Sequence, residues 1–363
     1  MKVGILLVTS AIMLLFAPAA GGAGPALRKK APPPGDQTLR SLADQIGFKI
    51  GAAIAPMPFR QEPQYQEVLA REFNSAESVT IFKLMEPQEG EFNFAVMDHE
   101  MEFARRSRLT LFGGPLIYKP STLPPWMHKL FWTESALDAV TRYHIESLVR
   151  HAGGSYAAWE VVNEPLTTAN RPWGTTFSRE EYIARAFRYA HEANPDAVLL
   201  LNQSFGRSGV DQNLANQFFE LAGKLKARGA PLNAAGIEMH LEMQLLRPGY
   251  LQEFHEFLSH AQQAGLQVYV TEMDAYQGPP GAVSNPMERQ KQVYHDVLAA
   301  CLESAACKAF YTWGVSDRHN MYQNRPEDPR PDAQPLPFDD NYRKKPAYYG
   351  MLQALQERVS RTK

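Results

Sequence analysis

Two short apolar runs of the chain each lead into a glutamate. Glu164 lies just after the run 158–162, and Glu272 directly follows the run 267–271. Two opposed carboxyl groups can break a glycosidic bond, because one attacks the anomeric carbon while the other protonates the departing oxygen. Retention of configuration needs the two groups at about 5 to 5.5 Å. We therefore predict Glu164 as the acid/base and Glu272 as the nucleophile.

These glutamates belong to a regular alternation of short apolar runs and longer segments with helical periodicity. Such alternation predicts βα units, and crossovers of that length make the strands parallel. The chain has no glycine-rich dinucleotide fingerprint, which favours a closed (β/α)8 TIM barrel of the α/β class over an open sheet. The predicted strands are 48–55, 78–82, 109–113, 158–162, 197–202, 235–239, 267–271 and 310–313.

In a barrel of this kind, chemistry takes place where the strands end. The fourth and seventh strands are three apart around a ring of eight, so glutamates at their carboxyl ends can face each other across the mouth. We expect one catalytic domain over residues 39–361. The proline-rich segment 325–337, after the last strand, is predicted to be an exposed loop on the same face.

The N-terminus has the order of a secretory signal peptide. One basic residue, Lys2, precedes an apolar run at 3–16 and several small residues, which predicts a signal peptide over 1–23. The following segment, 24–38, has the composition of a flexible linker. The run is too short to cross a bilayer comfortably. We expect a secreted, periplasmic or extracellular protein with no membrane anchor after cleavage.

Charge excludes one class of partner. The formal net charge is −2, so the chain lacks the basic field that binding to phosphate backbones requires. The aromatic content of 11% fits a large core or sugar-stacking platforms equally well. We expect a polysaccharide substrate, no nucleic acid, and a monomer.

The two cysteines, Cys301 and Cys307, lie close together in the sequence. In an exported chain this spacing favours a disulfide bond. Two buried thiols are the alternative, and a metal site is less consistent because no His or Cys partners stand at ligand spacing.

Several motifs resemble glycoside hydrolase family 10, the endo-β-1,4-xylanase family. Residues 159–164 read Trp-x-Val-Val-Asn-Glu, similar to the acid/base motif, and 271–274 read Thr-Glu-Met-Asp, similar to the nucleophile motif. Further matches lie at 186–195, 236–240 and 313–317, and the segment 335–348 resembles the closing signature. The cysteine pair also falls where many members have a disulfide bond.

The resemblance implies roles for residues around the two glutamates. Asn163 matches the residue that bonds the sugar 2-hydroxyl, and Trp313 the floor of the cleavage subsite. His240 is expected to contact Glu272, with Asp274 fixing its tautomer. Lys83, predicted at the end of the second strand, matches a lysine that bonds the glycone sugars, although a solvated lysine is an open alternative.

The sequence departs from the family pattern on the glycone side. Thr80 stands for an asparagine, Gly114 for a histidine, Glu238 for a glutamine and Met321 for a tryptophan. These changes remove hydrogen-bond partners and bulk, so recognition should differ while the chemistry is kept. The remaining residues expected to bind substrate or support the site are Tyr118, which stands where the family has tryptophan, and Asn202 at the end of the fifth strand.

The sequence thus predicts a retaining endo-β-1,4-glycanase, with xylan as the leading substrate. The alternatives are a retaining hydrolase of another β-linked glycan or glycoconjugate, and a secreted sugar-binding protein without catalysis. A binding protein has no need for two opposed carboxylates, which are costly to desolvate. No metal or organic cofactor is implied, because two carboxyl groups suffice for this reaction.

Overall fold

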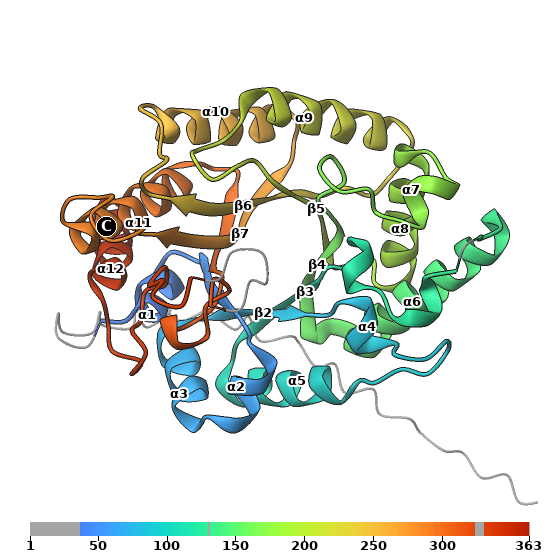
Figure 1. Ribbon diagram of the computed structural model, residues 1–363, viewed down its shortest axis with the longest axis horizontal. Helices are drawn as coiled ribbons and strands as arrows, with labels where there is room; N and C mark the ends of the chain where they lie inside the picture. The colour runs from blue at the N-terminus through green and yellow to red at the C-terminus, as the bar shows by residue number, and fades with distance from the viewer. Residues whose placement is uncertain (1–36, 130, 324–329, 363) are drawn as a thin grey trace, which may run out of the picture. The chain divides into compact units, whose positions relative to one another are not determined.

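The computed structural model describes residues 37–129, 131–323 and 330–362, and its strands form a closed parallel barrel. Each strand pairs with the next in the sequence, and β8 pairs with β1 (Figure 1). The predicted (β/α)8 barrel is therefore confirmed. The strands are β1 (Lys49–Ala53), β2 (Ser75–Val79), β3 (Thr110–Gly114), β4 (Tyr156–Asn163), β5 (Val198–Ser204), β6 (Ala234–Glu242), β7 (Gln267–Tyr276) and β8 (Cys307–Thr312).

The helices surround the ring of strands (Figure 1). Their apolar faces are buried, as expected for helices that cover a sheet. They are α1 (Leu39–Gln45), α2 (Pro56–Gln61), α3 (Pro63–Glu72), α4 (Phe82–Met85), α5 (Ala95–Ser107), α6 (Glu134–Ala152), α7 (Trp173–Thr176), α8 (Arg179–Ala193), α9 (Gln212–Ala227), α10 (Tyr250–Gln263), α11 (Pro286–Glu303) and α12 (Pro346–Arg361).

A small apolar cluster fills the barrel interior. It contains Phe112, Tyr269 and Tyr311 together with alanines and Leu200. Gly51 is required here, because a Cβ at that position would lie 2.3 Å from the Tyr311 ring. Glu77 and Glu160 are also buried, on β2 and β4. Glutamates are seldom fully buried, so two buried carboxyl groups distinguish this barrel from one filled by apolar side chains alone.

The second strand differs from its prediction. It spans Ser75–Val79 rather than 78–82. The apolar residues Ile81 and Phe82, which suggested a strand, are instead the N-cap and the first residue of the short helix α4. Phe82 packs outside the barrel, with its ring stacked 3.5 Å from the His144 ring. The prediction failed because Ser75 and Glu77 are buried polar residues within the strand, whereas sequence patterns mark strands by apolar runs.

The C-terminal part of the chain closes the barrel through covalent and polar contacts. Cys301 of α11 and Cys307 of β8 form the predicted disulfide bond. Lys345 Nζ donates to Asp317 Oδ2 at 2.6 Å and to two backbone carbonyls, which ties α12 to the loop after β8. Of the predicted exposed loop 325–337, residues 325–329 lie outside the described part. Residues 335–337 are buried, so the prediction of exposure is wrong there.

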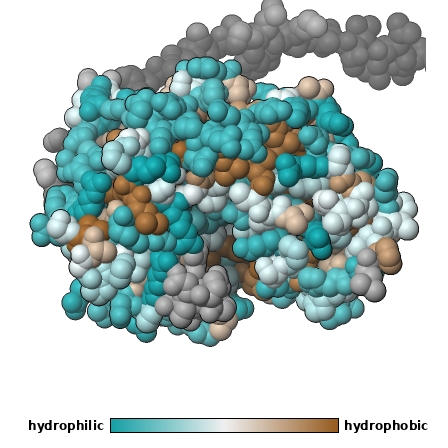
Figure 2. Space-filling model, turned by 45° about the horizontal axis from the view of Figure 1, so that its top comes forward, coloured by the Kyte–Doolittle hydropathy of each residue, from teal (hydrophilic) through white to brown (hydrophobic). Residues whose placement is uncertain are grey.

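The predicted signal peptide and almost all of the linker also lie outside the described residues. Among the described helices, none has the length and apolar character needed to cross a membrane. The face of the protein in Figure 2 is mostly hydrophilic and is hollowed near its centre.

Candidate active site

Glu272 lies within β7, whereas the sequence predicted that the strand ends at Thr271, and the strand continues to Tyr276. The pairing register between β6 and β7 shifts between Ile237 and Glu238, so that Glu238 and Glu272 become partners. A shift of this kind re-aims side chains and is common beside active sites. It places the two carboxyl groups next to each other.

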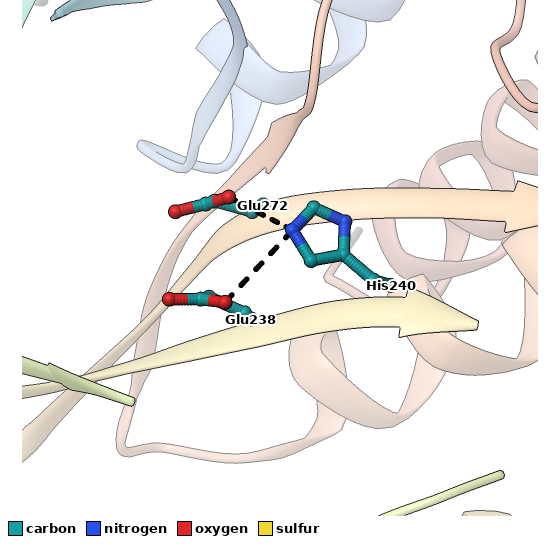
Figure 3. Close-up of side chains that lie close together, drawn as sticks. All are labelled: Glu238, His240 and Glu272. Carbon is teal, nitrogen blue, oxygen red and sulfur yellow. Dashed lines mark hydrogen bonds and ion pairs between the residues drawn. The ribbon is translucent and has the colours of Figure 1, made fainter. Parts of the chain in front are cut away.

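His240 holds the Glu272 carboxylate. Its Nε2 lies 2.9 Å from Glu272 Oε2, and its Nδ1 lies 2.8 Å from Asp274 Oδ2 (Figure 3 shows the Glu272 contact). Burial opposes a charged imidazole, but the charge and hydrogen bond of Asp274, supported by Glu272, raise the pKa of His240 well above its usual value. An imidazolium donates from both nitrogens, so His240 can bind both carboxylates at once.

A tyrosine completes this chain of contacts. Tyr322 Oη donates to Asp274 Oδ1 at 2.8 Å, and both residues are buried. The predicted arrangement of His240 and Asp274 around Glu272 is present in the structure. Tyr322 was not predicted, because nothing in the spacing of two residues 48 positions apart points to a contact.

Opposing effects act on the nucleophile candidate. Burial raises the pKa of Glu272, whereas the hydrogen bond and charge of His240 lower it. The charge of Glu164 acts in the raising direction, which means that the two predicted catalytic carboxyls lie within electrostatic reach of each other. The imidazolium therefore favours the ionised carboxylate that a nucleophile needs.

Glu164 is held differently. It follows the last residue of β4 with a left-handed backbone φ of 47°, and its amide donates to the Asn202 carbonyl at 2.9 Å. A non-glycine residue in this region of φ is uncommon and carries strain that often marks functional sites. The Tyr118 hydroxyl donates to Glu164 Oε2 at 2.6 Å. Burial and the charge of Glu164 raise the pKa of Tyr118, so it remains a neutral donor.

Two asparagines connect β4 to β6 and β7. Asn202 Nδ2 donates to Asn163 Oδ1 at 3.1 Å and to Glu238 Oε1 at 3.2 Å, while its Oδ1 accepts from Thr271 Oγ1 at 2.9 Å. Asn202 thus lies between β4, β6 and β7 and fixes the side chains of all three. These contacts are consistent with the supporting role expected for Asn202.

Glu238 is buried and borders both predicted catalytic groups. Burial, followed by the charges of Glu272 and Glu164, raises its pKa well above the usual value. Its Oε2 lies 3.9 Å from His240 Nε2, as the second dashed line of Figure 3 shows. A carboxyl group therefore lies where the family resemblance places the neutral side chain of glutamine.

Of the other predicted residues, Trp313 lies beside His240, whereas Lys83 lies away from its predicted position. Trp313 directly follows β8, and its ring centroid lies 6.0 Å from that of His240 in an edge-on arrangement. Lys83 does not end the second strand. It lies in α4, and its Nζ donates to the Ser121 carbonyl at 2.8 Å. Met321 packs against the cluster that contains Tyr276 and Tyr322.

Two further carboxyl groups near the site were not predicted. Glu77 and Glu160 are each 1% exposed, and burial is the main cause that raises their pKa well above the usual value. Both sense the charges of Glu238 and Glu272. Glu160 occupies the variable position of the acid/base motif, and Glu77 interrupts the apolar pattern of β2, so neither position attracted attention in the sequence.

The fold and the paired carboxyls define a class, that of barrel enzymes that cleave glycosidic bonds. The model of glycosyl hydrolase family 10 matches residues 38–354. The chain therefore belongs to glycosyl hydrolase family 10 and is a glycoside hydrolase.

Named relatives and solved structures agree with this assignment. Endo-1,4-beta-xylanase B of Thermotoga neapolitana is 28% identical, over 89% of this chain and 93% of its own length. Native xylanase 10B of Thermotoga maritima superposes with a TM-score of 0.81 at 28% identity, covering 90% of this chain and all of that one. Xylanase 10B of Thermotoga petrophila, solved with xylobiose, has a TM-score of 0.80 at 28% identity, covering 89% of this chain and 98% of that one.

Proposed function

We propose that this protein is a retaining endo-1,4-β-xylanase in which Glu272 is the nucleophile and Glu164 the acid/base. The observation that carries the proposal is the contrasting support of the two groups. The His240 imidazole binds Glu272, whereas the Tyr118 hydroxyl donates to Glu164. The substrate is supported by the names of relatives that align over most of the chain.

In the first step, a Glu272 carboxylate oxygen attacks the anomeric carbon of the sugar at the cleavage site. Glu164 transfers its proton to the glycosidic oxygen, so that the leaving sugar departs neutral. A covalent glycosyl-enzyme forms. During the attack Glu272 loses its negative charge. His240 contacts one oxygen of the carboxylate and orients it, while the other oxygen attacks.

In the second step, Glu164 is ionised and removes a proton from water, which attacks the same carbon and releases Glu272. The Tyr118 hydroxyl donates to Glu164 and stabilises its charged form at this stage. In this proposal Asn163 bonds the sugar 2-hydroxyl, an interaction that strengthens as positive charge develops on the ring. The side-chain amide oxygen of Asn163 accepts a hydrogen bond from Asn202 Nδ2.

A second candidate is a retaining hydrolase of another β-linked glycan. Thr80 is fully buried, and its Oγ1 has no hydrogen-bond partner among the described residues. At Gly114, a Cβ would lie 2.4 Å from the Glu160 Cβ, so the position is closed to a side chain in this backbone. Neither position offers the side chain that the family resemblance expects to bind sugar there. This difference favours a changed preference for the glycone sugar.

We also propose secretion and a monomeric, unanchored mature protein. The disulfide bond between Cys301 and Cys307 supports an oxidising compartment, because such bonds are rare in the cytosol. The composition of the first residues supports export. Fractionation of producing cells, followed by sizing of the exported protein, tests both points.

The test of function is reducing-sugar release from xylan, mixed-linkage β-glucan, cellulose and mannan. Release of mixed xylo-oligosaccharides, with β-anomers formed first in an NMR time course, is the expected result. Activity confined to another glycan would replace xylan with that substrate. Binding without turnover on every polymer would overturn the enzymatic role and leave a sugar-binding protein.

A further inference from the structure

Three side chains of β6 and β7 present metal-ligand atoms to one point. One atom each from Glu238, His240 and Glu272 lies within 4.8 Å of the other two, and all three residues are buried. His240 Nε2 lies 2.9 Å from Glu272 Oε2 and 3.9 Å from Glu238 Oε2. Two tetrahedral ligands at about 2.0 Å from a metal are about 3.3 Å apart, so these separations bracket the required value. Figure 3 shows both carboxylates meeting the same ring nitrogen.

The histidine is already oriented as a metal ligand would be. Asp274 Oδ2 binds Nδ1 at 2.8 Å, which leaves Nε2 directed at the two glutamates. A carboxylate on the far nitrogen is the usual support of zinc-binding histidines, since it fixes the ring and raises its basicity. Tyr322 in turn fixes Asp274 at 2.8 Å. A metal at this point would take the place of the Nε2 proton.

Two buried carboxyl oxygens outside the three-ligand set lack hydrogen-bond partners in the described part of the chain. Glu77 Oε2 and Glu160 Oε1 have no hydrogen-bond partner among the described residues, and each residue is 1% exposed. Both carboxyls lie within electrostatic reach of Glu238 and Glu272. Buried charges of one sign are costly unless they are paired, protonated or bound to a cation. A cation held by Glu238, His240 and Glu272 would reduce the repulsion among these buried carboxyl groups.

We propose that Glu238, His240 and Glu272 form an inhibitory site for a divalent transition metal of the Zn²⁺ type. One imidazole and two carboxylates suit Zn²⁺, whereas Ca²⁺ and Mg²⁺ prefer six or more oxygen ligands or retained water. Water fills the fourth position. Binding releases the Nε2 proton of His240, and a proton from Glu238 where it carries one, to solvent.

The bound metal blocks catalysis because it engages the carboxylate that must attack the sugar. This inhibitory part rests on the proposed function, whereas metal binding does not. Glu238 is the distinctive ligand, because the family resemblance places a neutral glutamine at that position, and a carboxylate binds Zn²⁺ where an amide does so poorly.

Binding is tested by isothermal titration of the whole purified chain with ZnCl2 in a non-chelating buffer. We expect one Zn²⁺ per chain, with little binding of Mg²⁺. Glu238→Gln keeps the side-chain volume and should weaken Zn²⁺ binding by about tenfold to a hundredfold. Glu220→Gln, a matched change at an exposed residue of α9, should bind as the parent does. Thermal melts without metal show whether each variant is folded.

Activity supplies the second arm. Zn²⁺ should inhibit xylan hydrolysis by the parent, EDTA should restore it, and the inhibition constant should rise in Glu238→Gln in step with the dissociation constant. Absence of Zn²⁺ binding, or equal binding by parent and Glu238→Gln, would overturn the site. Binding without inhibition would overturn the inhibitory role. A parent that binds Zn²⁺ but cleaves no glycan would contradict the proposed function while leaving the site in place.

Discussion

The two predicted catalytic carboxyls are supported in opposite ways. Glu272 lies within a continuing strand and is bound by a chain of buried groups that runs through His240 and Asp274 to Tyr322. Glu164 lies just beyond its strand and is half-buried, and among the described residues its side chain accepts one hydrogen bond, from Tyr118. The proposed nucleophile is thus fixed by charge and burial, whereas the proposed acid/base keeps access to solvent.

This difference corresponds to the two tasks. A nucleophile remains ionised and stationary until it attacks, so a permanent cation beside it is useful. An acid/base must exchange a proton in each half of the cycle, and a neutral donor permits both states. A fixed cation beside Glu164 would favour only the ionised state.

The largest expected effect comes from removing the nucleophile. Glu272→Ala should lower kcat on xylan by at least about four orders of magnitude, because no glycosyl-enzyme can form. Added azide should restore turnover with inverted configuration, which NMR of the first product detects. Near-normal turnover in a folded variant would show that another group is the nucleophile.

Removal of the acid/base should depend on the leaving group. Glu164→Ala should slow xylan hydrolysis by about a hundredfold to ten-thousandfold. Aryl xylosides with activated leaving groups should lose much less in the bond-breaking step, because their departure needs no proton. Pre-steady-state rates on both substrates provide the measurement. Equal losses would exclude the acid/base assignment.

The contacts that run from Asp274 through His240 to Glu272 can be weakened by a substitution that keeps the side-chain size. Asp274→Asn keeps the shape but removes the charge that supports the His240 imidazolium. We expect kcat to fall by about a hundredfold, the scale for losing a buried hydrogen bond to a charged group. The loss should be similar for good and poor leaving groups, in contrast to Glu164→Ala. A loss that grows with leaving-group basicity would instead link Asp274 to the acid/base.

The smallest effect is expected at the neutral donor. Tyr118→Phe removes the hydrogen bond to Glu164 and should reduce kcat on xylan by about tenfold. Tyr143→Phe, at an exposed tyrosine of α6, is the matched control. The loss should persist for activated aryl substrates in the hydrolysis of the glycosyl-enzyme, where Glu164 acts as a base. If Tyr118→Phe behaves like the control, the contact has no catalytic importance.

The sequence predicted the barrel and its catalytic edge because these depend on local patterns. The runs before Glu164 and Glu272 are apolar, so their strands were found, although the end of β7 was placed at Thr271 instead of Tyr276. The strand β2 was displaced because Glu77 gives its buried face a polar character.

Contacts that depend on tertiary structure could not be predicted in the same way. Tyr322 reaches Asp274 from the loop after β8, and neither periodicity nor spacing encodes that approach. Lys83 was assigned from a motif position, yet α4 directs its amine to the Ser121 carbonyl. Motifs locate groups that sit on the regular framework, and they are less reliable where a loop or short helix intervenes.

The close approach of Gly114 to Glu160 limits which residues can occupy position 114. A Cβ at Gly114 would lie 2.4 Å from the Cβ of Glu160 and 2.9 Å from its carbonyl oxygen. Restoring the histidine that the family resemblance places there is therefore blocked by the backbone of β4 as well as by the side chain. A side chain at position 114 would require β3 and β4 to move apart. Gly114→His alone is therefore not expected to create the sugar contact that the family resemblance implies.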